Sequence, residues 1–345
     1  MINIELLKKL CNTSGISGDE GEVRSAILEE IKDLTKYIKV DALGNIIALK
    51  KGKKSAKQKL MLCAHMDEVG FIVTDINEDG FLKFESVGGI NSNSIISRSV
   101  SVGKNKIKGV IGTKPVHLVK KDEINKPVSI SEMYIDIGAK DKNDAQKYVS
   151  YGDSISFDNS FEYSNGIIKS KAIDDRVGCA ILIEIMKRDL PVDMYFTFMT
   201  QEEIGLRGAK VCSYNVDPDS AIVVEGTTAA DVFNINKDEQ VCKLNSGAVI
   251  SFMDKRTVYD KSYFELACKI AKKEEISYQI KRAVAGGNDA GAIQASRSGV
   301  KTIALSVPCR YIHTAESVAN ENDVNAVYKL AFKLVCKIAQ SEENK

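Results

Sequence analysis

The chain has 345 residues, which is enough for about two domains of ordinary size. Its 44% hydrophobic and 28% charged residues are typical of a globular protein and exclude a disordered or fibrous chain. Because 48 basic residues balance 47 acidic ones, no overall field attracts nucleic acid or an anionic membrane. The longest stretch without Asp, Glu, Lys or Arg, Ser86–Ser97, is polar, so we predict no membrane-spanning helix.

The cysteines and the N-terminus bear on the cellular compartment. The eight cysteines contain no C-x-x-C pair, and most have apolar neighbours, as free buried thiols do. The first residues lack the apolar core of a signal peptide. We therefore expect a reduced, cytoplasmic protein.

The first part of the chain has helical and then strand patterns. A helix is expected at Ile4–Leu10, and Ser17–Glu22 would cap a second helix whose apolar positions run from Val23 to Ile31. Tyr37–Val40 and Asn45–Leu49 are typical of paired strands. Lys59–His65 is a nearly continuous apolar run, which predicts a central strand covered on both faces.

From Val69 to Phe161 the pattern changes to short β-like segments separated by turn residues, which predicts a β-rich unit. The expected strands are Gly70–Val73, Phe81–Phe84, Ser99–Val102, Lys106–Ile111 and Met133–Ile137. Seven lysines between Lys104 and Lys126 form a basic stretch. Because acids are interleaved with them and aromatic residues are missing, we interpret it as solvated surface rather than a nucleic-acid groove.

After Lys171 strands and helices alternate again. The expected helices are Val177–Arg188, Leu206–Ser213, Tyr263–Lys273, Ala290–Ser298 and Val324–Ile338, and the expected strands are Met194–Met199, Ser220–Val224 and Thr302–Val307. This alternation predicts an α/β fold with a mixed sheet sandwiched by helices. We therefore predict a discontinuous catalytic domain, residues 1–68 and 162–345, interrupted by a small β-barrel-like domain at 69–161.

Acids and histidines stand at five places where α/β enzymes hold their sites, namely strand ends and the loops that follow. They are His65 with Asp67, the pair Asp174-Asp175, the pair Glu202-Glu203, Glu225, and His313. Each alone has an ordinary structural explanation, since Asp174 or Asp175 could cap a helix and Glu202 could be solvated. Together they favour a metal site, because carboxylates beside buried strands are costly unless protonated, paired or metal-bound.

The residue types also restrict the metal. Two histidines and several carboxylates, without a thiolate cluster, are typical ligands of Zn²⁺, Co²⁺ or Mn²⁺. Adjacent acids such as Glu202 and Glu203 cannot easily serve one ion identically. One can act as a ligand while its neighbour serves as general base.

Six motifs resemble those of the M42 family of co-catalytic metallo-aminopeptidases, in the order of that family and over essentially the whole chain. They are HMDEVGF from His65, KAIDDRVG from Lys171, TQEEIGLRGA from Thr200, VEGT from Val224, GGNDA from Gly286 and RYIHT from Arg310. The resemblance implies an enzyme that uses two divalent cations to remove single N-terminal residues from short peptides.

The resemblance also implies a role for each matching residue. Asp174 would bridge two ions; His65 and Glu225 would complete one ligand set, and Glu203 and His313 the other. Glu202 would be the general base and acid. Asp67, which also comes from the first motif, would orient His65. A cis peptide bond would follow Asp174.

Several positions are open to more than one interpretation. Glu225 stands where many family members have Asp, and Asn288 where Thr is frequent. Asp289 either caps the helix that follows or contacts substrate. His117 belongs to a motif of the insert that lacks the family's second proline, and it is either structural or a substrate contact.

Two other enzyme classes remain possible at this point, a glycoside hydrolase of the endoglucanase type and a metal-dependent deacylase. The lack of Trp disfavours a glycoside hydrolase, because aromatic faces are natural platforms for sugar rings. A metal-stabilised protein without catalysis is a third reading. The resemblance further implies that the insert builds a homo-oligomer, from dimers up to a hollow dodecamer.

Overall fold

The apolar run that ends at His65 forms strand β3 (Leu60–His65) of the computed structural model, which describes residues 1–120 and 126–343. All six residues of β3 are buried. Alternate side chains enter two different cores, with Leu60 and Leu62 on one face and Met61 and Cys63 on the other. This strand therefore lies inside a sheet that is covered on both faces, as its sequence predicts.

The sheet has eight strands in the order β1-β2-β12-β3-β13-β16-β14-β15. The four strands β12, β3, β13 and β16 run parallel to one another, and β2 and β14 flank them in antiparallel orientation. Their carboxyl ends consequently open at one edge, where the acids and histidines gather. The remaining strands are β1 (Tyr37–Val40), β2 (Ile46–Lys50), β12 (Met194–Met199), β13 (Ser220–Thr228), β14 (Ala248–Ile250), β15 (Tyr278–Ile280) and β16 (Lys301–Cys309).

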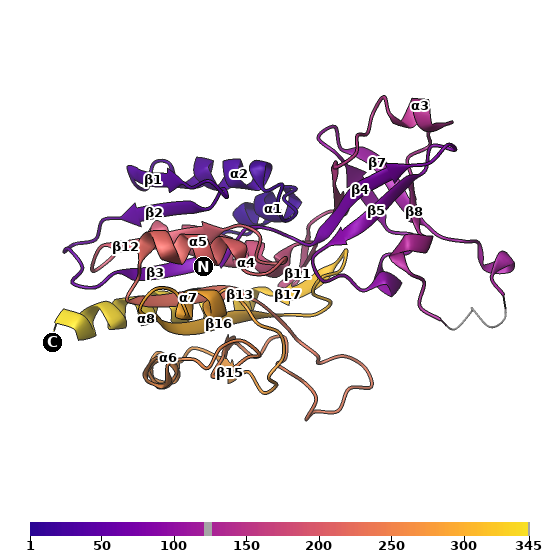
Figure 1. Ribbon diagram of the computed structural model, residues 1–345. Helices are drawn as coiled ribbons and strands as arrows, with labels where there is room; N and C mark the ends of the chain where they lie inside the picture. The colour runs from indigo at the N-terminus through magenta and orange to yellow at the C-terminus, as the bar shows by residue number, and fades with distance from the viewer. Residues whose placement is uncertain (121–125, 344–345) are drawn as a thin grey trace.

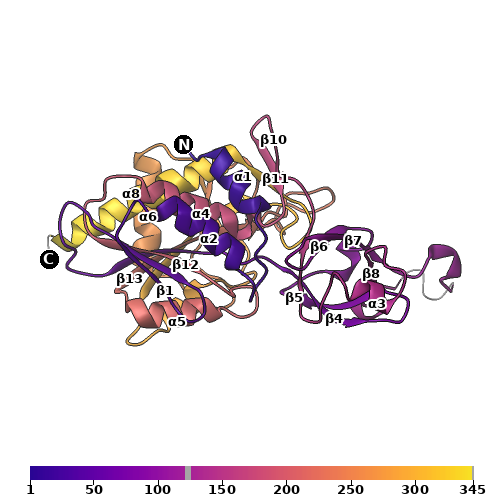
Figure 2. The same cartoon turned by 90° about the horizontal axis from the view of Figure 1, so that it is seen from above.

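Helices cover both faces of this sheet (Figures 1 and 2). Five of them contribute to the larger core, and two pack on the opposite face. The first group is α1 (Ile4–Asn12), α2 (Gly21–Ile31), α4 (Ile173–Met186), α6 (Lys261–Lys273) and α8 (Glu321–Glu343); the second is α5 (Arg207–Val216) and α7 (Ala290–Gln294).

The segment between the first two motifs folds as a closed, antiparallel six-stranded barrel beside the α/β unit (Figure 1). Its core contains Phe71, which makes edge-to-face contacts with Phe84 and Phe157 at 5.1 and 5.4 Å between ring centroids. The barrel strands are β4 (Gly70–Ile76), β5 (Leu82–Val87), β6 (Ser99–Val102), β7 (Ile107–Gly112), β8 (Tyr134–Asp136) and β9 (Ser154–Phe157). They are joined through the short helix α3 (Lys142–Ala145) and the 3-10 turns η1 (Ser92–Ser94), η2 (Val116–Leu118) and η3 (Ile130–Glu132).

A third, three-stranded sheet lies near the junction of the two units (Figure 1). It has the order β10 (Glu162–Ser164), β11 (Ile167–Ser170) and β17 (Ser317–Asn320). Strand β11 leads directly into the segment that carries Asp174. The predicted fold class, a mixed α/β sheet with an inserted barrel, is confirmed.

Within Ser17–Glu22, the segment expected to cap α2, Glu20 is the N-cap residue and the hydroxyl of Ser17 binds Asp67. Two other local expectations were wrong. Helix α7 ends at Gln294 rather than Ser298. Strand β13 continues to Thr228, so Glu225 lies within the strand and not at its end. The β9, β10, β11, β14, β15 and β17 strands were not anticipated, because each has only three or four residues and too few positions to show a period.

Within the described residues, no helix combines the length and the apolar character that a membrane crossing requires. Of the lysine-rich stretch discussed above, residues 121–125 lie outside the described residues, so the surface interpretation of Lys121 and its neighbours is not tested.

Candidate active site

The carboxylate of Asp174 lies between two histidines. Its Oδ1 is 3.4 Å from Nε2 of His65, and its Oδ2 is 3.6 Å from Nε2 of His313. His65 ends β3, Asp174 lies at the irregular start of α4, and His313 belongs to the loop between β16 and β17. Three segments far apart in the sequence therefore deliver one carboxylate with a histidine on each side.

Glu203 completes this group. Its Oε1 lies 3.2 Å from Nε2 of His313, and its side chain is 5% exposed. Donor atoms of His65, Asp174 and Glu203 all lie within 4.8 Å of one another, a separation at which a single cation can contact them together. This group contains Asp174 and one member of each predicted ligand set.

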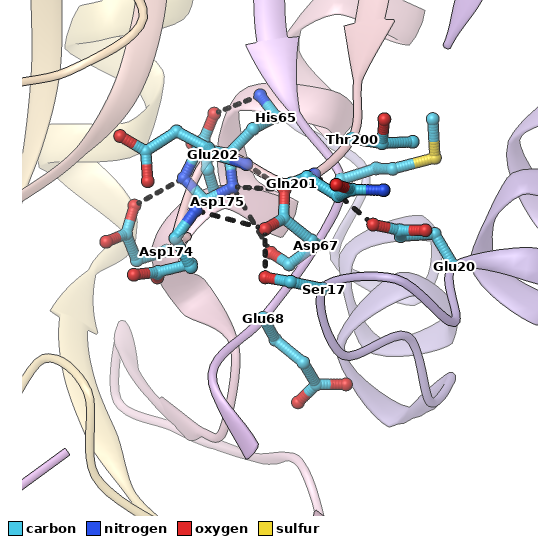
Figure 3. Close-up of polar contacts among 12 residues, drawn as sticks. Ser17, Glu20, His65, Asp67, Glu68, Asp174, Asp175, Thr200, Gln201 and Glu202 are labelled. Atoms are coloured by element: carbon cyan, nitrogen blue, oxygen red, sulfur yellow. Dashed lines mark hydrogen bonds and ion pairs between the residues drawn. The ribbon is translucent and has the colours of Figure 1, made fainter. Parts of the chain in front are cut away.

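Asp67 organises the two acids that follow β12. Its Oδ1 accepts the backbone N–H of Glu202 at 3.0 Å, and its Oδ2 accepts that of Glu203 at 3.1 Å. Ser17 donates its hydroxyl to the same Oδ2 at 2.6 Å. Figure 3 shows Asp67 at the centre of these contacts, with His65 beside it, at 3.4 Å between Oδ1 and Nδ1. One buried carboxylate therefore fixes both the histidine and the acid pair.

A cavity of about 140 Å³ opens beside this group. His65, Asp174, Glu202, Glu225 and His313 line it, together with the loop that carries Gly286 and Gly287. Thr227, Thr228, Val241 and Lys281 also line it. The predicted general base thus faces a space into which a small substrate group can enter.

Glu225 is held by a hydrogen bond from Asn288. Asn288 donates its side-chain N–H to Oε1 of Glu225 at 2.8 Å and also lies 2.8 Å from the hydroxyl of Tyr259. Gly226 follows Glu225, and a Cβ at that position would come within 3.0 Å of Asp174 Oδ1. A side chain at this position would crowd the central carboxylate, so β13 passes it closely at a glycine.

The inserted barrel contributes one group to the site. Nδ1 of His313 lies 3.1 Å from the carbonyl oxygen of Gly89, in the loop after β5. If this nitrogen carries the proton, Nε2 presents its lone pair toward Asp174 and Glu203, as a metal-binding histidine requires. No sequence pattern indicates this contact, because any residue type can supply a backbone carbonyl.

The pKa shifts reflect an excess of buried carboxylates at the site. Burial raises the pKa of Glu202 and Glu203, with contributions from the neighbouring carboxylates, and it raises the pKa of Glu225 to about 8. Burial alone would lower the pKa of His313, but Asp174 and Glu203 raise it to about 11. Raised pKa values of both the acids and the histidines mean that the cluster favours added positive charge, which bound cations can supply in place of protons. Because its donors are two imidazoles and several carboxylates, it fits divalent ions of the zinc type.

The peptide bond between Asp174 and Asp175 is cis, as the resemblance implies. The two aspartates have different surroundings. Asp175 accepts the N–H of Gly178 at 3.0 Å and that of His65 at 3.2 Å, so it does act as a helix cap, whereas Asp174 faces the histidines.

The two remaining candidates, Asp289 and His117, differ in their surroundings, since Asp289 is buried and His117 is exposed. Asp289 is 2% exposed, and neither of its carboxylate oxygens has a hydrogen-bond partner among the described residues. By position Asp289 is the N-cap residue of α7, although its side chain makes no capping hydrogen bond. His117 is exposed in η2, which lies at the outer end of the barrel in both views, away from the α/β unit (Figures 1 and 2).

Comparison with known proteins gives a consistent result. Residues 44–330 match the family model described as M42 glutamyl aminopeptidase. A provisionally named aminopeptidase of Acetivibrio thermocellus is 39% identical over 96% of this chain and 98% of its own. The lysyl aminopeptidase of Pyrococcus furiosus is 32% identical over 97% of both chains.

Solved structures agree over nearly the whole chain. A TET aminopeptidase from a marine sediment archaeon of the Thaumarchaeota has a TM-score of 0.93 at 31% identity, covering 98% of both chains. The TET1 peptidase of Pyrococcus horikoshii, described as assembling into a tetrahedron or a large octahedral shell, has a TM-score of 0.84 at 34% identity, covering 96% of this chain and 98% of its own. A Thermotoga maritima protein named as an endoglucanase has a TM-score of 0.81 at 34% identity, covering 98% and 100%.

Proposed function

The chain belongs to the M42 family of aminopeptidases, and on that premise we propose that it removes single N-terminal residues from short peptides with the help of two divalent cations. Its reaction class is therefore hydrolysis of peptide bonds. The observation that supports the dinuclear centre is the position of Asp174, whose two oxygens face two different histidines.

In this proposal Asp174 would be shared by the two ions, His65 and Glu225 would complete one ligand set, and Glu203 and His313 would complete the other. Zn²⁺, Co²⁺ and Mn²⁺ all suit these donors. When bound, the cations would supply Lewis acidity that lowers the pKa of a water molecule and stabilises the developing oxyanion.

Glu202 moves the proton. Its side chain lines the cavity, and its backbone is fixed through Asp67. Because burial raises the pKa of Glu202, its carboxylate is a stronger base than an exposed glutamate. It takes the proton of the attacking water and delivers it to the leaving amine. Asp67 acts by holding His65 and the acid pair in place.

An aminopeptidase requires a free α-amine on its substrate, which separates this function from its alternatives. The test compares a short peptide, the same peptide acetylated at its N-terminus, and a cello-oligosaccharide, each with and without a chelator. We expect release of the N-terminal residue from the free peptide alone, and only without the chelator. Cleavage of the acetylated peptide would support a deacylase or another peptidase class. Chelator-resistant cleavage of the oligosaccharide would support a glycoside hydrolase.

The same family membership bears on assembly. We propose that residues 69–161 mediate a homo-oligomer, from a dimer up to a dodecamer, by analogy with the assemblies described for the TET1 peptidase of Pyrococcus horikoshii. Deletion of a barrel is too disruptive a test, because Gly89 contacts the site. Analytical ultracentrifugation of the intact chain is suitable, and a monomer at all concentrations would contradict the proposal.

A further inference from the structure

A buried ion cluster lies next to the active site. Nζ of Lys171 lies 2.6 and 2.7 Å from the two carboxylate oxygens of Glu68, and Nη2 of Arg176 lies 3.2 Å from Oε1. The three side chains are 4%, 2% and 0% exposed, respectively for Lys171, Glu68 and Arg176. We propose that this Glu68–Lys171–Arg176 cluster is a positioning unit that sets the geometry, and hence the cation affinity, of the Asp174 centre.

Each member belongs to a segment that carries a site residue. Glu68 follows Asp67, Lys171 precedes Asp174 by three positions, and Arg176 follows it by two. Figure 3 shows that the neighbours Asp67 and Glu68 point in opposite directions, Asp67 toward the acid pair and Glu68 away from it. The cluster therefore links the segment after β3 to the segment at the start of α4, and both segments also carry site residues.

Arg176 extends the cluster to the N-terminal segment. Its Nε donates to the carbonyl of Met66 at 2.8 Å, and its Nη1 donates to those of Leu10 and Thr13 at 2.5 and 2.7 Å. Ser17, a few residues further on, donates its N–H to the carbonyl of Glu68 and its hydroxyl to Asp67. A continuous set of contacts thus connects the cluster to the acid that orients Glu202 and Glu203.

The energetics argue against a role in stability alone. Burying one carboxylate and two cationic side chains costs desolvation free energy that burying apolar side chains of similar volume would not. Such a cluster is therefore weak evidence for stabilisation. Glu68 and Lys171 also line one small crevice with Asp174, Glu203 and His313, where barrel and α/β unit meet. Hydrogen-bonded ion pairs at that place constrain the orientation of the segments that carry them, whereas apolar contacts are not directional.

The proposal rests on the proposed function only for the position of the cations, and its test can fail separately. The double variant Glu68→Gln/Lys171→Met replaces the ion pair with neutral side chains of similar size. The matched control is Lys169→Met, two residues earlier and within strand β11, where the ammonium pairs with Glu162 and Glu316 at the surface. Lys171→Arg keeps the charge. For each variant the melting temperature, the Co²⁺ dissociation constant by competition with a chromophoric chelator, and kcat and KM are measured.

We expect the double variant to fold while its Co²⁺ affinity and kcat fall by about tenfold or more, as for other groups that support metal ligands from behind. KM should change much less, since the cluster does not contact substrate. Lys171→Arg should retain more Co²⁺ affinity than the double variant. Lys169→Met should have the Co²⁺ affinity and kcat of the wild type. A folded double variant with unchanged Co²⁺ affinity would overturn the proposal. If the double variant does not fold, unchanged affinity in a folded Lys171→Met single variant would do the same. A wild type that binds Co²⁺ but hydrolyses no peptide would contradict the proposed function and leave the affinity comparison valid.

Discussion

Nδ1 of His313 lies 3.1 Å from the carbonyl oxygen of Gly89, so a peptide group of the inserted barrel holds a histidine of the catalytic unit. The loop that carries Gly89 also approaches Glu203, because a Cβ on Gly88 would come within 3.4 Å of the Cβ of Glu203. The barrel therefore supports the His313 half of the site directly, in addition to the part in assembly that we propose for it.

This contact predicts that displacing the loop weakens the site. Gly88 has a φ of +90°, and a Cβ there would lie 2.7 Å from Cγ1 of Val69. Gly88→Ala should therefore shift the Gly89 carbonyl and lower Co²⁺ affinity by about tenfold. Gly138→Ala is the control, since that residue also has positive φ, +75°, but open space around it. Equal effects of the two substitutions on Co²⁺ affinity would show that backbone strain alone is responsible.

Asp67 is fully buried, and its carboxylate should be essential for the geometry of the acid pair. Asp67→Asn replaces one acceptor oxygen with an N–H₂ group, which cannot accept the N–H of Glu202 or Glu203. We expect kcat to fall by about 10- to 100-fold while the protein still folds. Asp158→Asn, which alters a surface pair with Lys108, should have no effect. Steady-state kinetics on a free peptide decide between these results, and an active Asp67→Asn enzyme would exclude the orienting role.

Glu202→Gln separates proton transfer from cation binding. Because Glu202 is not among the proposed ligands, the variant should keep its full cation content and lose about 10²- to 10⁴-fold in kcat. Glu274→Gln, which removes a surface partner of Lys333, serves as the control. Loss of cations from Glu202→Gln, measured by elemental analysis, would instead place Glu202 among the ligands.

Removal of the cations should make stability depend on pH in a defined direction. Burial raises the pKa of Glu225 from 4.5 to about 8, and Asp174 and Glu203 raise that of His313 to about 11 although burial opposes the shift. The folded protein thus binds these protons more tightly than the unfolded chain does. Its stability is fully present below the unfolded pKa values and is lost as pH rises through the folded ones.

We therefore expect the melting temperature of chelator-treated protein to fall between pH 4.5 and about 8, and Glu225→Gln to reduce the slope. Added Co²⁺ should raise the melting temperature most at the high end of this pH range, where protons no longer compete with the cation for the ligands. A melting temperature that rises with pH in the cation-free protein would contradict this electrostatic account.

The sequence predicted the α/β frame and the barrel because long apolar periods and turn-rich segments mark them clearly. His65, Asp174, Glu203 and His313 were singled out together, and the structure brings them together. Three features had no sequence signal. The Gly89 carbonyl is backbone, the Ser17 hydroxyl resembled a helix cap, and the Glu68 cluster depends on tertiary burial of charges. Periodicity and motifs report residue types along the chain, whereas these contacts depend on which distant segments come together in the folded protein.

The central claim, that Asp174 joins two cation sites, is tested most directly by cation stoichiometry. Purified protein is equilibrated with Co²⁺, freed of excess ion, and analysed by mass spectrometry for metal per chain, together with His65→Ala and His313→Ala. We predict two ions per chain in the wild type, and loss of cation content and activity in each variant. Unchanged content and activity in both variants would contradict the account.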